Sequence, residues 1–95
     1  MHRKRVTMIQ KMFSIYDQKS GTFHVPFFKP THGEAERDFR SAVNDPKSTL
    51  NQYPDDFDLY YLGEYDSNVG KFAPLDSPNH CLKAVQCVNP KPLQN

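Results

Sequence analysis

The strongest strand signal in the chain is the stretch Phe57-Asp58-Leu59-Tyr60-Tyr61-Leu62-Gly63-Glu64-Tyr65. Its apolar side chains alternate with a period of two, the spacing of a β-strand with two different faces. The alternation predicts one face with Phe57, Leu59, Tyr61 and Tyr65, and a second with Asp58, Tyr60, Leu62 and Glu64. Residues 66–70 have the composition of a hairpin loop, and residues 71–75 return as a second strand. The sequence therefore predicts an antiparallel hairpin.

Further elements are predicted on the N-terminal side of this hairpin. Residues 11–17 are rich in aromatic and β-branched side chains and form a strand, with Phe13 and Ile15 toward the core. Residues 23–30 contain two prolines, which remove backbone donors, so they form an edge strand or an ordered connector. From Thr31, an N-cap with Glu34 three residues later, apolar residues recur with helical spacing until Asn-Asp-Pro at 44–46 ends the helix.

This order of elements predicts the α+β class. We expect a small antiparallel sheet of about three strands with one amphipathic helix packed on one face. The 95 residues leave room for a single hydrophobic core. The expected boundaries are a basic N-terminal arm at 1–10, the α+β domain at 11–76 and a C-terminal tail at 77–95.

No stretch of the chain predicts a membrane segment or a secretion signal. Its apolar runs are far shorter than the roughly 18 residues that cross a bilayer. The basic start at residues 2–5 is followed by no apolar segment of the kind found in signal peptides. Cys81 and Cys87 are too few and too close in sequence for a disulfide framework, so we expect two reduced thiols.

Two clusters of polar residues could carry chemistry, but neither has the spacing that a site requires. The aspartates Asp55, Asp56 and Asp58 could hold a hard cation or transfer protons, yet no calcium-loop pattern and no His or Glu partner accompanies them. The group His80, Cys81 and Cys87 could bind zinc or form a Cys–His nucleophile, but it lacks a Cys-x-x-Cys motif and a fourth ligand. The four glycines form no phosphate-binding loop. We therefore expect no enzyme activity, metal, cofactor or small-molecule substrate.

The formal net charge of +1 hides an uneven distribution. Arg3, Lys4, Arg5 and Lys11 lie within the first eleven residues, where there is no acidic residue. The remaining residues hold eight basic and eleven acidic side chains, a net charge of −3. A protein that followed a phosphate backbone over its whole surface would be basic throughout, so any contact with nucleic acid must be local.

Aromatic residues supply much of the apolar surface, and some could stack on unpaired bases. The candidates are Tyr16, Phe27, Phe28, Tyr60 and Tyr61, although packing in a core or an interface is the commoner use of such rings. Tyr60 is disfavoured because Asp58 and Glu64 are expected beside it on the same face, where they would repel phosphates. That face, with Tyr60 and Leu62, could equally be the interface of a homodimer.

Several segments, taken in order, resemble one family of viral proteins. They are Ile15-Tyr16-Asp17, Phe27-Phe28-Lys29-Pro30-Thr31, Val43-Asn44-Asp45-Pro46 and residues 53–66, of which Leu62-Gly63-Glu64-Tyr65-Asp66 is the most specific. The series resembles the small nonstructural protein of gokushoviruses, the single-stranded DNA phages of the Microviridae. The resemblance covers residues 11–75. The arm is then expected to be an extension, with Met8 and Met12 as alternative starts, and the tail has no counterpart.

The resemblance implies a DNA-binding protein that assists phage genome replication or single-strand synthesis in the cytoplasm of the bacterial host. We expect non-enzymatic binding of DNA, with single strands favoured, through local cationic patches and aromatic stacking. The expected binding residues are Arg3, Lys4, Arg5, Lys11, Lys29, Arg37, Arg40, Phe27 and Phe28. One alternative is a protein-interaction module, either monomeric or dimeric, that recruits a replication factor without touching DNA. Another is a small metal-dependent nuclease built on Asp55, Asp56 and Asp58.

Overall fold

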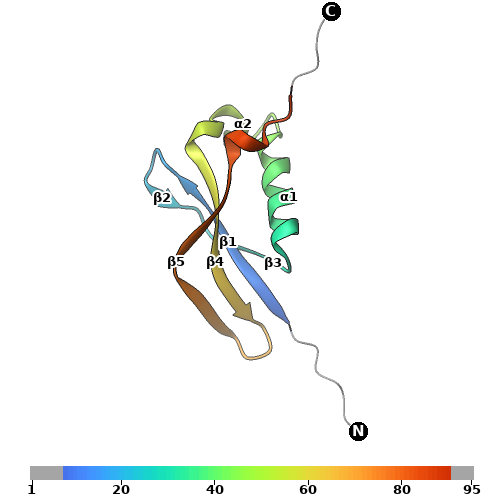
Figure 1. The fold of residues 1–95 in the computed structure, drawn as a ribbon, viewed down its shortest axis with the longest axis vertical. Helices are drawn as coiled ribbons and strands as arrows, with labels where there is room; N and C mark the ends of the chain where they lie inside the picture. The colour runs from blue at the N-terminus through green and yellow to red at the C-terminus, as the bar shows by residue number, and fades with distance from the viewer. Residues whose placement is uncertain (1–7, 91–95) are drawn as a thin grey trace, which may run out of the picture.

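The computed structural model describes residues 8–90, which form five strands, two α-helices and two short 3-10 turns (Figure 1). The strands are β1 (Ile9–Asp17), β2 (Thr22–Phe23), β3 (Phe27–Lys29), β4 (Phe57–Asp66) and β5 (Lys71–Lys83). The helices are α1 (His32–Val43) and α2 (Thr49–Gln52), and the 3-10 turns are η1 (Pro54–Asp56) and η2 (Ala84–Cys87). The strand predicted at residues 57–65 is thus confirmed as β4.

The strands form one antiparallel sheet in the order β2-β1-β4-β5, with β3 pairing with β1 beside β2. The predicted α+β class holds in outline, but the sheet has five strands instead of about three. The added strands, β2 and β3, are too short to show a clear alternation in the sequence. Strand β5 contains Pro74 and Pro78, which are tolerated because an edge strand needs backbone partners on one side only.

Helix α1 forms where the sequence predicts it. The Thr31 hydroxyl accepts a hydrogen bond from the Glu34 backbone N–H at 3.2 Å, which satisfies one of the free donors of the first turn. Its buried residues Ala35, Phe39 and Val43 belong to the same apolar cluster as side chains of β1 and β4. No helix within residues 8–90 is long and apolar enough to cross a membrane.

A bulge at Leu62 interrupts the pairing of β4 with β1. Phe13 pairs with Tyr61, whereas the preceding residue Met12 pairs with Gly63, so Leu62 has no partner on β1. Gly63 has a φ of +138°, a conformation that side chains with a Cβ rarely adopt. The extra residue exchanges the two faces of β4 from this point onward.

Because of the bulge, the faces predicted for the second half of β4 were wrong. Tyr65 was expected beside Tyr61 on the core face, but it lies on the same face as Tyr60. Glu64 was expected beside Tyr60, but it lies on the face of Tyr61, where its carboxylate is 4.0 Å from the Lys11 ammonium. Both predictions were wrong because regular alternation was assumed through Gly63.

The domain extends further along the chain than the predicted boundary at residue 76. That boundary falls within β5, and η2 contributes Ala84 and Cys87 to the core. The Asn44 side chain, at the end of α1, donates a hydrogen bond of 2.9 Å to the Cys87 carbonyl. Residues 77–87 are therefore part of the domain. Residues 1–7 of the predicted arm and 91–95 of the predicted tail lie outside the described residues, and residues 9 and 10 begin β1.

Candidate nucleic-acid interface

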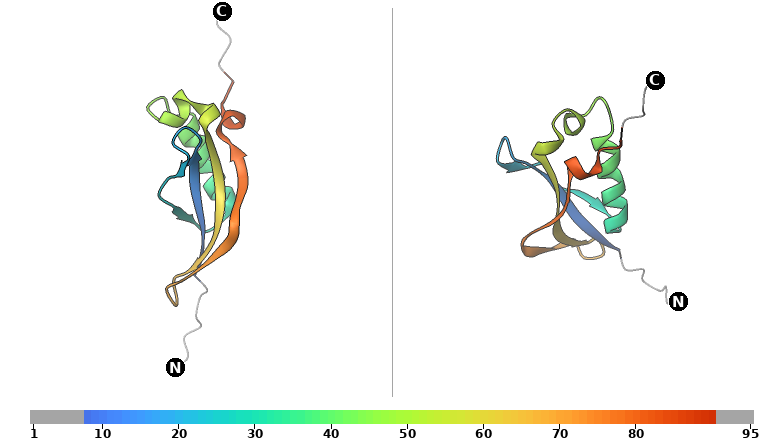
Figure 2. Two further views of the ribbon diagram at one scale, coloured as in Figure 1. Left: turned by 90° about the vertical axis from the view of Figure 1, so that its left-hand side faces the viewer. Right: turned by 45° about the horizontal axis from the view of Figure 1, so that its top comes forward.

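The two faces of the sheet have different surroundings (Figure 2). Helix α1 lies on the face that carries Phe13 and Leu59, and its Phe39 belongs to the same buried cluster as these two residues. The opposite face, called the outer face below, carries the side chains that alternate with them, including Tyr16 and Tyr60. Three rings on the outer face, those of Phe23, Phe28 and Phe72, are exposed.

The first ring cluster on the outer face consists of Tyr16, Phe23, Tyr60 and His80. Strand register brings these residues together, because Tyr16 pairs with Phe23 and Tyr60 pairs with His80. Ring centroids lie 4.8 Å apart for Tyr16 and Phe23, 5.3 Å for Phe23 and Tyr60, and 5.2 Å for Tyr60 and His80. Phe23 is 41% exposed. Adjacent exposed rings of this kind can stack on unpaired bases.

The second ring cluster consists of Phe28, Tyr65 and Phe72. Phe28 lies 5.7 Å from Tyr65 and 6.4 Å from Phe72, and the last two rings are 4.8 Å apart. Phe28 is 40% exposed and Phe72 is 60% exposed, values that are high for large apolar side chains. The outer face therefore carries a second aromatic surface, and the bulge at Leu62 is what brings Tyr65 into it.

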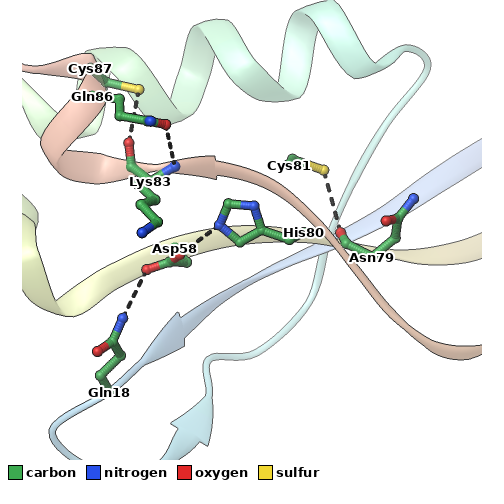
Figure 3. Close-up of polar contacts among 8 residues, drawn as sticks. All are labelled: Gln18, Asp58, Asn79, His80, Cys81, Lys83, Gln86 and Cys87. Carbon is green, nitrogen blue, oxygen red and sulfur yellow. Dashed lines mark hydrogen bonds and ion pairs between the residues drawn. The ribbon is translucent and has the colours of Figure 1, made fainter.

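Asp58 is the register partner of Tyr16 and is 6% exposed, and Figure 3 shows its side chain beside that of His80. Its carboxylate accepts hydrogen bonds from His80 Nε2 at 2.6 Å and from Gln18 Nε2 at 3.2 Å. Glu64, which was expected beside Tyr60, lies on the other face. Of the two acids expected to repel phosphates at Tyr60, only Asp58 therefore shares its face, and two hydrogen-bond donors hold its carboxylate.

Within residues 8–90, the predicted cationic residues do not gather on the outer face. Lys11 approaches Glu64, and its ammonium lies 5.6 Å from the centroid of the Tyr61 ring on the core face. Lys29 forms a 2.5 Å ion pair with Asp38, and the hydrogen bond from Lys29 lowers the pKa of the Asp38 carboxyl. The exposed side chains of Arg37 and Arg40 belong to α1. Arg3, Lys4 and Arg5 lie outside the described residues.

The two predicted stacking residues, Phe27 and Phe28, point to opposite faces of the sheet. Phe27 is half-buried, and its ring is 5.9 Å from that of Phe13. It lines a surface groove of about 320 Å³ between the sheet and α1, together with Lys29 and Phe39. Phe28 belongs to the second ring cluster. The predicted site residues that the structure describes, Lys11 to Arg40, therefore do not form one surface.

Sequence reasoning missed Phe23, Tyr65, Phe72 and His80 as members of the outer face. One signal was available for Phe23, since residues 18–21 suit a tight hairpin turn that places it opposite Tyr16. The other three depend on the register of β5 and on the bulge in β4. Neither feature follows from local composition.

The candidate metal ligands and nucleophiles are not assembled into a site. Within residues 8–90, no group of three or more His, Cys, Asp or Glu side chains could hold a metal ion. The Cys81 thiol donates to the Asn79 carbonyl, while His80 is turned toward Asp58 (Figure 3). Burial raises the pKa of both the Cys81 and Cys87 thiols, which disfavours the reactive thiolate. In the structure the two thiols donate to backbone carbonyls and His80 bonds Asp58, so neither thiol is paired with His80.

The chain has relatives among phage proteins. A family model described as Phage ORF5 protein matches residues 10–87, so the chain belongs to the Phage ORF5 protein family. It is similar to Protein ORF5 of Chlamydia phage 1, with 40% identity over 70 residues that cover 68% of this chain and 72% of the relative. No solved structure matches the chain. The resemblance to a gokushovirus protein is thus confirmed, and the chain is a nonstructural bacteriophage protein of the Microviridae.

Proposed function

We propose that this protein binds single-stranded DNA on the outer face of its sheet and assists phage genome replication in the cytoplasm of the infected bacterium. The proposal assigns it no catalytic activity of its own. One observation carries the proposal, namely the two clusters of partly exposed rings on the face opposite α1. Base–ring stacking contributes about 1 to 3 kcal/mol per base and tolerates any sequence.

Single strands suit this face better than duplex DNA. The bases of a duplex are stacked on one another and leave no ring face for a protein side chain, whereas unpaired bases expose theirs. Residues 8–90 hold eight basic and eleven acidic side chains, so they lack the surplus of cations that duplex binding requires.

The electrostatic contribution is expected to be modest and local. Lys83 is exposed and is the register partner of Asp58, so it lies beside the first ring cluster. If Lys83 and the three cations Arg3, Lys4 and Arg5 each neutralise one phosphate, the logarithm of affinity falls with the logarithm of salt concentration with a slope of about −3.

Fluorescence anisotropy with a labelled thymidine 20-mer and a matching duplex, at two salt concentrations, tests the proposal. Tyr60→Ala is expected to weaken single-strand binding about tenfold, because one stacking contact is lost. Tyr60→Phe keeps the ring and should bind as the wild type does. The double variant Arg37→Ala/Arg40→Ala should change affinity by less than about twofold, because α1 lies on the other side of the sheet.

Equal affinity for duplex and single strand, or no effect of Tyr60→Ala, would contradict the proposal. A loss confined to the double arginine variant would instead favour the helix-edge interface expected from the sequence. Circular dichroism of each variant separates these outcomes from unfolding.

A second candidate function is self-association or protein binding through the same face. It is favoured by the apolar exposure of Phe23, Phe28 and Phe72, since such rings commonly lie in interfaces. Sedimentation equilibrium without DNA decides between the two functions. A dimer that Phe72→Ala converts to a monomer, in a protein that retains no oligonucleotide, would support the second candidate.

A further inference from the structure

We infer that the two ring clusters are separate base-binding subsites on one strand path, so that the protein grips a DNA strand at two places and passes over the segment between them. This inference rests on the proposed function and specifies its ligand. The ligand is a single strand long enough to reach from the first ring cluster to the second.

The spacing of the subsites follows from strand register. In the first ring cluster, Tyr60 is paired with Ser14, and Phe23 is paired with Tyr16. In the second, Tyr65 is paired with Gln10, and Phe28 is paired with Met12. The two clusters are therefore centred four residues apart along β1, which corresponds to about 13 Å at the rise of a β-strand.

The floor between the clusters offers no ring for stacking. Met12 and Ser14 lie between the two cluster centres on β1 and are 7% and 0% exposed, and Gly63, the partner of Met12 on β4, is buried and has no side chain. The Ser14 hydroxyl donates to the His24 carbonyl at 2.6 Å. Among the ring contacts of residues 8–90, none bridges the two clusters. Bases over this floor would make no stacking contact.

Positive charge is available at one end of the path, which suits a polyanion. Lys83 lies beside the first ring cluster. The chain enters the sheet next to the second, because Ile9 pairs with Asp66 and Gln10 pairs with Tyr65.

The spacing sets a minimum length for the ligand. Stacked nucleotides rise about 3.4 Å each along one strand, so a centre-to-centre distance of about 13 Å corresponds to about four nucleotides. A dinucleotide can occupy one ring cluster only. A strand of about six or more nucleotides can occupy both and gains from the second contact at high effective concentration.

Oligonucleotides with abasic positions test the inference directly. The first probe carries two thymidines, three abasic sites and two thymidines. The control probe has the same number of phosphates and of thymidines, but all of its thymidines are at one end. Wild-type protein is expected to bind the first probe at least about tenfold more tightly, because stacking at the second cluster is added without added charge. Phe72→Ala and Tyr60→Ala should each abolish this difference.

The possible outcomes separate the inference from the proposed function. Equal binding of the two probes, by a protein that still binds a thymidine 20-mer, would overturn the two-subsite inference and leave the proposed function intact. Failure to bind the 20-mer as well would overturn both. Phe72 is 60% exposed, so its removal should leave the fold intact, and circular dichroism checks this.

Discussion

Replacing Gly63 with alanine is expected to lower the free energy of unfolding by about 3 kcal/mol. A Cβ at this position would lie 2.4 Å from the Ala73 carbonyl oxygen and 2.7 Å from the Pro74 Cα, and backbone atoms cannot move aside as a flexible side chain can. The φ of +138° adds strain for any residue with a Cβ. Urea denaturation followed by circular dichroism measures the loss.

Gly70→Ala is the matched control for this substitution. Gly70 also has a positive φ, of +68°, but an added Cβ would meet nothing within 4 Å. Its replacement should therefore lower the free energy of unfolding by only about 1 kcal/mol, the cost of a positive φ for a residue with a Cβ. Equal losses in the two variants would show that β4 and β5 do not approach each other closely at Gly63. The bulge that places Tyr65 on the outer face would then be in doubt.

Replacing Phe39 with alanine is expected to lower the free energy of unfolding by about 3 to 5 kcal/mol, the largest single effect that we predict for this chain. Phe39 is 2% exposed and lies in the middle of α1, within the same cluster as Phe13 and Leu59. Its removal leaves a cavity between helix and sheet. Thermal and urea denaturation would both show the change.

Phe72→Ala provides the comparison, because this ring is 60% exposed on the outer face. We expect this substitution to lower the free energy of unfolding by about 1 kcal/mol or less, since the ring buries little apolar area in the folded protein. If Phe39→Ala and Phe72→Ala destabilised the protein equally, α1 would not be packed on the sheet as described. The distinction between a covered face and an outer face would then fail.

Local signals in the sequence were enough to predict α1 and the centre of β4. Thr31 and Glu34 mark the start of the helix, Ala35, Phe39 and Val43 recur at helical spacing, and Asn44 closes it. Each of these signals acts within a few residues, so no knowledge of the tertiary structure is needed to interpret them.

The features that the sequence did not predict depend on contacts between distant residues. The bulge at Leu62 is visible only when β4 is set against β1, and it reverses the faces of Glu64 and Tyr65. Strand β5 continues past Pro78 because its edge position tolerates proline, and local composition therefore resembled a tail. Short strands such as β2 gain their stability from the neighbouring strand.

The same dependence on contacts between distant residues explains why the site predicted from the sequence differs from the outer face. Charge counts along the sequence favoured cations such as Lys11 and Lys29, but the structure places an acidic partner beside each of them. From the sequence, Asp58 was expected to repel phosphates. In the structure its carboxylate is hydrogen-bonded by His80, which lies twenty-two residues later in the chain. The aromatic outer face emerges only when the strands are assembled.

Photocrosslinking tests the central claim, binding of a single strand by the outer face, most directly. A thymidine 20-mer substituted with 5-iodouracil would be irradiated with the full chain, and the adducts located by peptide mass spectrometry. We predict adducts at outer-face rings such as Tyr16, Tyr60, Tyr65 and Phe72. Tyr53, which is 56% exposed and lies outside the outer face at the end of α2, serves as the internal control and should remain unmodified. Adducts confined to α1 or Tyr53, with none on the outer face, would contradict the account.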